Sequence, residues 1–182
     1  MASRSRIRSA KRTGSSPVLN RLEEKMKTWI GIDNGVSGSI GVLSEANAPQ
    51  FIHAREYTRK NTKKKSALEV DPFALLILLQ NSRPNGIVLE RPYRGAYRTT
   101  EISAATFDGV VRTVMELYSL PFIQVDSREW QKPLLGTVPA GETKRASAAK
   151  GMLRWPSLKE QIEDHGDADG LWMAAYAMRL FP

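Results

Sequence analysis

The feature that most constrains the fold is a pair of short apolar segments that each end on a carboxylate. Residues 28–33 read Thr-Trp-Ile-Gly-Ile-Asp, and residues 86–90 read Gly-Ile-Val-Leu-Glu. Such runs of β-branched and aromatic residues predict buried strands. A carboxylate directly after a buried run loses hydration unless it is paired or binds a cation, and ligands gather at the strand ends of α/β sheets. Asp33 and Glu90 are therefore candidate ligand-binding residues, although either alone would suit an ordinary strand-to-loop transition.

The residues around the first carboxylate predict an antiparallel start to the sheet. Asn34-Gly35 is a typical hairpin turn, so residues 28–33 should pair with a second strand over residues 37–43. Residues 51–57 predict a third strand.

The rest of the chain predicts helices that alternate with strands. Asp71 before Pro72 marks the start of a helix that runs to about residue 80. A longer helix over residues 102–118 should bury one apolar face, with Ala105, Val110, Val114 and Leu117. Later elements are expected at residues 121–125 (strand) and at 127–135, 143–153 and 167–180 (helices). The predicted fold class is α/β, a mixed sheet of three antiparallel strands followed by parallel strands, flanked by helices.

Length and composition narrow the possible partners. A chain of 182 residues suits one folded domain, expected over residues 26–182, and its longest apolar run, residues 73–79, is too short to cross a membrane. The absence of cysteine excludes disulfides and thiolate zinc sites. A net charge of +8 favours polyanions such as nucleic acid, although it also suits a merely well-solvated surface.

Residues 1–25 are rich in Arg, Lys and Ser and are expected to form a disordered basic arm or an extension ahead of the domain. Such an arm could grip a DNA backbone. A transit segment has a similar composition, so the expected location is the cytoplasm of a bacterial or phage-infected cell, or an organelle if the segment is a transit peptide.

A third acidic segment, residues 164–171, reads Asp-His-Gly-Asp-Ala-Asp-Gly-Leu. His165 and Asp169 are four residues apart and are expected to share one face at the start of a helix, with Asp167 pointing away. Asp164 and Asp167 are more simply explained as residues that cap the helix. Carboxylates with one imidazole suit Mg²⁺ or Mn²⁺, and two such ions about 4 Å apart can promote phosphodiester hydrolysis.

Taken in order, these segments resemble RuvC-like Holliday junction resolvases, in particular their phage-type and organellar branches. The resemblance rests on residues 31–38, Gly-Ile-Asp-Asn-Gly-Val-Ser-Gly, on Val88-Leu-Glu90 and on residues 165–171, and it extends over residues 27–180. Two departures are Asn34, where proline is common, and Gly170, where alanine is usual and where glycine weakens a helix start. Some relatives also place the last two ligands three residues apart, and at that spacing this chain has Gly166.

The resemblance implies an RNase H-like fold, a homodimer, divalent metal, and paired symmetric nicks in a four-way DNA junction. By position it implies four catalytic metal ligands: Asp33, Glu90, His165 and Asp169, with Asp167 as the open alternative to His165 as the fourth ligand. It also matches Lys144 to a basic residue near the scissile phosphate, although a solvent-facing lysine would explain Lys144 equally well.

The segment after Glu90 is the expected DNA-contacting wedge, although an ordinary mobile loop is the simpler alternative. Arginines contact phosphates and tyrosines stack on unpaired bases. The residues expected to contact DNA are Arg91, Tyr93, Arg94, Tyr97, Arg98, Lys132 and Lys144.

Three other functions compete with that of a Mg²⁺-dependent crossover junction endodeoxyribonuclease. Another RNase H-like nuclease would cut an RNA–DNA hybrid, and a non-catalytic module would only bind branched DNA. The Asp-x-Gly pattern at Asp33 also occurs in actin-like ATPases, but those need two lobes and a second phosphate loop, for which this chain is too short.

Overall fold

A five-stranded mixed sheet forms the centre of the computed structural model, which describes residues 26–61, 68–92 and 98–182. The strand order is β3-β2-β1-β6-β7, and a separate two-stranded sheet pairs β4 with β5. The strands are β1 (Thr28–Ile32), β2 (Ser39–Ser44), β3 (Gln50–His53), β4 (Thr58–Lys60), β5 (Leu68–Val70), β6 (Gly86–Glu90) and β7 (Phe122–Val125). Strands β1, β2 and β3 are antiparallel neighbours, whereas β1, β6 and β7 run parallel, which confirms the predicted fold class.

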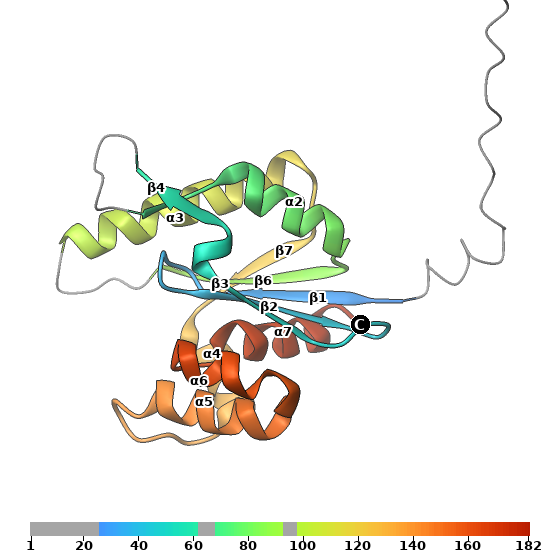
Figure 1. The fold of residues 1–182 in the computed structure, drawn as a ribbon, viewed down its shortest axis with the longest axis vertical. Coiled ribbons are helices and arrows are strands. Elements are labelled where there is room, and N and C mark those ends of the chain that lie inside the picture. The colour runs from blue at the N-terminus through green and yellow to red at the C-terminus, as the bar shows by residue number, and fades with distance from the viewer. Residues whose placement is uncertain (1–25, 62–67, 93–97) are drawn as a thin grey trace, which may run out of the picture.

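Helices cover both faces of the main sheet (Figure 1). Helices α2 (Pro72–Ser82) and α3 (Arg98–Leu117) lie on one face. Helix α7 (Asp169–Leu180) crosses the other face, and α4 (Ser127–Leu135), α5 (Thr143–Arg154) and α6 (Lys159–His165) lie beyond it. The short 3₁₀ turn η1 (Ala54–Glu56) connects β3 to β4, and a second one, η2 (Pro156–Leu158), connects α5 to α6. No helix in the described ranges is long and apolar enough to cross a bilayer.

Alternation along the central strands supplies a hydrophobic core on each side. In β1, Ile30 and Ile32 pack toward α2 and α3, whereas Trp29 packs toward α7. Strand β6 does the same, with Ile87 and Leu89 on one face and Val88 on the other. A strand buried on both faces needs apolar side chains at every position, which is why both segments are continuously hydrophobic.

Helix α7 lies unusually close to the sheet because glycines line the contact. Gly31 and Gly41 are paired across β1 and β2, and a Cβ atom on either would overlap the backbone of α7 at Gly170. A Cβ on Gly170 would itself lie 2.8 Å from the backbone nitrogen of Gly41. Gly170, which costs helix propensity, is therefore required for this close approach.

Short sequence patterns closely predicted the bounds of several helices and strands. Asp71 is the N-cap of α2, and its Oδ1 accepts hydrogen bonds from the backbone nitrogens of Phe73 (3.0 Å) and Ala74 (3.2 Å). Helix α4 has the expected bounds, and β7 begins one residue later than expected.

Two expectations were wrong in detail. The third strand ends at His53, because the chain turns into η1 instead of continuing to Tyr57. Helix α3 begins four residues earlier than expected, and its buried face differs from the predicted one: Ala105 and Leu117 are exposed. The buried side chains on α3 are Phe107, Val111, Val114 and Met115, because the larger Phe and Met fill the space above the sheet. The expected arm, residues 1–25, lies outside the described residues.

Candidate active site

Asp33 and Glu90 lie side by side at the carboxyl end of the sheet. Ile32 of β1 is the register partner of Leu89 of β6, so the carboxylates that follow them are neighbours. The two carboxyl groups are close enough for each to shift the pKa of the other. The backbone nitrogen of Asp33 donates to the carbonyl of Ser39 at 2.9 Å, which ties the residue to the hairpin. The structure therefore brings together the two carboxylates that the sequence places at strand ends.

The segment around His165 is not one helix, contrary to expectation. Helix α6 ends at His165, Gly166 adopts a left-handed conformation with φ of 92°, and α7 begins only at Asp169. His165 and Asp169 therefore belong to different helices and do not share a helical face. Asp167 lies in the link between the helices, where its orientation does not follow helical periodicity.

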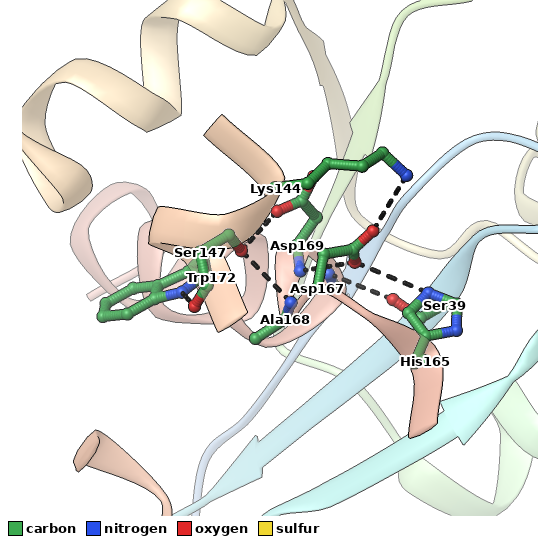
Figure 2. Close-up of polar contacts among 9 residues, drawn as sticks. Ser39, Lys144, Ser147, His165, Asp167, Ala168, Asp169 and Trp172 are labelled. Carbon is green, nitrogen blue, oxygen red and sulfur yellow. Dashed lines mark hydrogen bonds and ion pairs between the residues drawn. The ribbon is translucent and has the colours of Figure 1, made fainter. Parts of the chain in front are cut away.

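Asp167 points into the site instead of away from it, and it is only 1% exposed. Its Oδ2 accepts a hydrogen bond from Nζ of Lys144 at 3.0 Å, and its Oδ1 accepts one from the backbone nitrogen of Asp169 at 3.2 Å (Figure 2). Oδ1 also lies 3.5 Å from Nε2 of His165. One ligand atom from each of Asp33, His165 and Asp167 lies within 4.8 Å of the others.

Asp169 is buried beside this group. Its carboxylate accepts a hydrogen bond from the hydroxyl of Ser147 on α5, and it interacts electrostatically with Asp33, Asp167 and Glu90. The site thus gathers four carboxylates and one imidazole from two strand ends and one interhelical link.

Crowding and burial disfavour the charged forms of Asp33, Glu90 and Asp169. Burial raises the pKa of Asp33 well above its ordinary value, and the charges of Glu90 and Asp167 raise it further. Burial is also the main cause that raises the pKa of Glu90 to about 7 and that of Asp169 to about 8. Burial acts to lower the pKa of Lys144, but its hydrogen bond to Asp167 and the surrounding carboxylates raise it overall. A cation bound among these groups would relieve their mutual repulsion.

The residues fit a hard divalent cation. Nε2 of His165 is buried and has no hydrogen-bond partner among the described residues, so no hydrogen bond competes with a metal ion for this nitrogen. Burial lowers the pKa of His165, which favours the neutral imidazole that metal ions bind. Carboxylate oxygens with one imidazole form a donor set that suits Mg²⁺ or Mn²⁺.

Sequence reasoning missed several residues that support the site. Nε1 of Trp130 on α4 donates to Oε1 of Glu90 at 3.4 Å. Nδ2 of Asn34 donates to the Glu90 carbonyl and to Oδ1 of Asp108, each at 3.2 Å. Gln124 donates to the same oxygen of Asp108 at 2.6 Å. These partners lie 16 to 74 residues apart in the chain, so local spacing carries no signal for them.

The residues expected to contact DNA are only partly described. Arg91 is exposed but pairs with Asp126 at 3.1 Å and with Glu129 at 3.9 Å on α4. Lys132 is exposed on α4, and the exposed Lys144 reaches the site with its Nζ. Arg98 begins α3, whereas Tyr93, Arg94 and Tyr97 lie outside the described residues. A groove of about 1090 Å³ adjoins the site, with a lining that includes Asp33, Glu90, Arg91, Glu101, Asp108 and Arg128.

Known proteins share the fold of this chain. No protein-family model matches it, and neither does any curated protein sequence. Among solved structures, RuvC from Thermus thermophilus in complex with Holliday junction substrate matches with a TM-score of 0.56 and 16% identity, covering 84% of this chain and 96% of that chain. The fold is therefore of the RuvC type within the RNase H-like class, which confirms the sequence resemblance at the level of the fold.

Two further structures match with a TM-score of 0.48 each. They are another structure of Thermus thermophilus RuvC, at 16% identity over 85% of this chain and 97% of that chain, and the yeast mitochondrial Holliday junction resolvase Ydc2. Ydc2 is 15% identical, with 82% of this chain and 78% of that chain covered.

Proposed function

We propose that this chain is a metal-dependent endonuclease that cleaves four-way DNA junctions. The observation that carries the proposal is the convergence of Asp33, Glu90, Asp167 and Asp169 with His165 in one small acidic site beside Lys144. The same fold is seen in a protein solved with a Holliday junction. An acidic cluster of this kind has no evident structural purpose, since burial and repulsion make it unfavourable without a cation.

The metal ligands in this proposal are Asp33, His165 and Asp167, whose donor atoms lie close together, with Glu90 and Asp169 as adjoining carboxylates that would help to hold a second ion. Bound Mg²⁺ or Mn²⁺ would supply an activated water and charge stabilisation at the scissile phosphate. The set includes Asp167, which sequence reasoning set aside, together with the four residues that the family resemblance implies.

Lys144 is the residue proposed to meet the scissile phosphate. Its side chain is 76% exposed while its Nζ rests on the buried Asp167, so the ammonium lies at the boundary between the acidic site and solvent. Asp167 stabilises the positive charge of Lys144 there. Arg91, Lys132 and the arginines and tyrosines of residues 93–98 are proposed to contact the DNA arms, consistent with the net charge of +8.

Paired nicks in opposite strands need two active sites. One acidic site is present in the described ranges, so the proposal includes a homodimer with one site in each copy. Analytical ultracentrifugation of the protein, free and with a four-way junction, tests this part. Two copies per junction are expected, and one copy per junction would contradict paired cleavage.

The decisive experiment compares labelled four-way junction, linear duplex and RNA–DNA hybrid as substrates in Mg²⁺. Wild type should nick only the junction, in opposite strands, and Asp33→Asn should abolish nicking while binding persists. Asp164→Asn is the matched control, because this exposed carboxylate lies next to His165 in sequence. Cleavage of the hybrid alone would indicate a different nuclease on the same fold. Binding of the junction without cleavage would indicate a non-catalytic module.

A further inference from the structure

One face of α5 packs against the segment between α6 and α7 that includes Asp167 and leads into Asp169. Lys144, Ser147 and Gly151 are spaced three and four residues apart and so lie on one side of the helix. Lys144 contacts Asp167, and Ser147 contacts Asp169. Gly151 lies against Ala168, whose Cβ would clash with any side chain at position 151. A single helical face thus contacts Asp167 and Ala168 of the link and Asp169 at the start of α7.

Ser147 is central to this contact, and it is fully buried. Its hydroxyl accepts a hydrogen bond from the backbone nitrogen of Ala168 at 3.1 Å and donates to Oδ1 of Asp169 (Figure 2). Its carbonyl accepts a hydrogen bond from Nε1 of Trp172 at 3.1 Å. A serine hydroxyl has one proton, so the bond accepted from Ala168 leaves that proton for Asp169.

This arrangement orients the Asp169 carboxylate. The bond from Ser147 holds one of its two oxygens, and a carboxylate held at one oxygen cannot rotate freely about its last torsion. The backbone nitrogen of Asp169 is held in turn by Oδ1 of Asp167. Both the main chain and the side chain of Asp169 are therefore constrained.

We propose that Ser147 is a positioning residue that orients Asp169 for divalent-metal binding. The inference rests on the proposed function, since it assumes that Asp169 adjoins a metal. Partners that hydrogen-bond a metal-ligating carboxylate fix its direction, and their loss typically costs about 10- to 100-fold in metal affinity or activity. Ser147 acts through Asp169 and does not itself touch the reacting atoms.

A purely packing role for Ser147 makes a different prediction. Ser147→Ala removes the hydroxyl, whereas Ser147→Cys keeps a group of similar shape that is only a weak donor. If Ser147 only fills space, the Cys variant should resemble wild type and the Ala variant should lose only thermal stability. If Ser147 positions Asp169, both variants should lose metal affinity whatever their melting temperatures.

The test is Mg²⁺ binding by isothermal titration calorimetry on the full chain without DNA, with melting temperatures measured in parallel. Ser147→Ala and Ser147→Cys should each bind Mg²⁺ at least about tenfold more weakly than wild type. Junction binding in Ca²⁺ should be unchanged, and cleavage should recover at higher Mg²⁺. Ser157→Ala, at an exposed serine in η2, is the control and should match wild type.

Four results would overturn the inference or separate it from the proposed function. Mg²⁺ affinity within twofold of wild type in both variants overturns it, as does a loss confined to the Ala variant. If Ser147→Ala does not fold, the Mg²⁺ affinity of Ser147→Cys alone tests the inference, by the same twofold limit. A wild type that binds Mg²⁺ without cutting junctions contradicts the proposed function only, and a wild type that binds no Mg²⁺ contradicts both.

Discussion

Gly170, the second residue of α7, packs against Gly31 of β1 so closely that a Cβ atom on Gly31 would overlap the carbonyl oxygen of Gly170. Gly31 lies two residues before Asp33, and Gly170 directly follows Asp169. The contact between the two glycines therefore sets how close the carboxylate at the end of β1 comes to the carboxylate at the start of α7. The geometry of the acidic site depends on two residues that contribute no side chain to it.

Gly31→Ala should destabilise the protein by about 3 kcal/mol, because the new methyl group meets backbone atoms that cannot rotate away. Urea unfolding followed by fluorescence measures the change. Gly109→Ala on α3 is the control, since nothing lies within 4 Å of a Cβ there, and alanine should stabilise this helix by up to about 1 kcal/mol. Equal effects at the two positions would contradict the close contact.

The metal-free protein should become less stable as pH rises from about 6.5 to about 8.5. Glu90 and Asp169 have pKa values of about 7 and about 8 in the folded state, above their ordinary values of 4.5 and 3.8. In this range the folded state binds more protons than the unfolded state, so the free energy of unfolding falls with rising pH. Melting temperatures in EDTA measure the trend.

Saturating Mg²⁺ should weaken this pH dependence, because a bound cation stabilises the charged carboxylates. The lowered pKa of His165 acts in the opposite direction below its ordinary value of 6.5 and offsets part of the trend there. A melting temperature in EDTA that increases with pH over this range would contradict the buried carboxylate cluster.

Asp167→Asn should reduce Mg²⁺ affinity and junction cleavage by at least about 100-fold, because a neutral amide replaces a proposed ligand that lies within reach of Asp33 and His165. Calorimetry and single-turnover cleavage measure the two effects. Glu163→Gln, at an exposed carboxylate on α6, is the control. If Asp167→Asn has activity near that of wild type, Asp167 is not a ligand, and the set of Asp33, Glu90, His165 and Asp169 is the better assignment.

Asn34→Ala should lower the free energy of unfolding by about 2 kcal/mol, because two hydrogen bonds are lost, one to Glu90 and one to the buried Asp108. Burial already raises the pKa of Asp108, and the bonds from Asn34 and Gln124 counter that rise. Asn47→Ala, at an exposed position after β2, should leave stability within about 0.5 kcal/mol of wild type. Equal stability of the two variants would show that the Asn34 amide is dispensable.

The sequence by itself determined those features that depend on residues close together in the chain. Continuous hydrophobic runs required strands buried on both faces, Asp71 before Pro72 set a helix start, and strand-terminal carboxylates marked one edge of the sheet. Each of these depends on neighbours within a few residues. That is why the mixed sheet and the positions of Asp33 and Glu90 at strand ends could be predicted.

Only the tertiary structure decided which residues of the interhelical link enter the site. A periodic helix through residues 165–169 would turn Asp167 away, but the left-handed Gly166 ends α6 and the glycine contact with the sheet positions α7. The bonds from Ser147 to Asp169 and from Asn34 to Asp108 span 22 and 74 residues. Side-chain convergence of this kind follows from how whole helices dock on the sheet, and local sequence patterns do not record it.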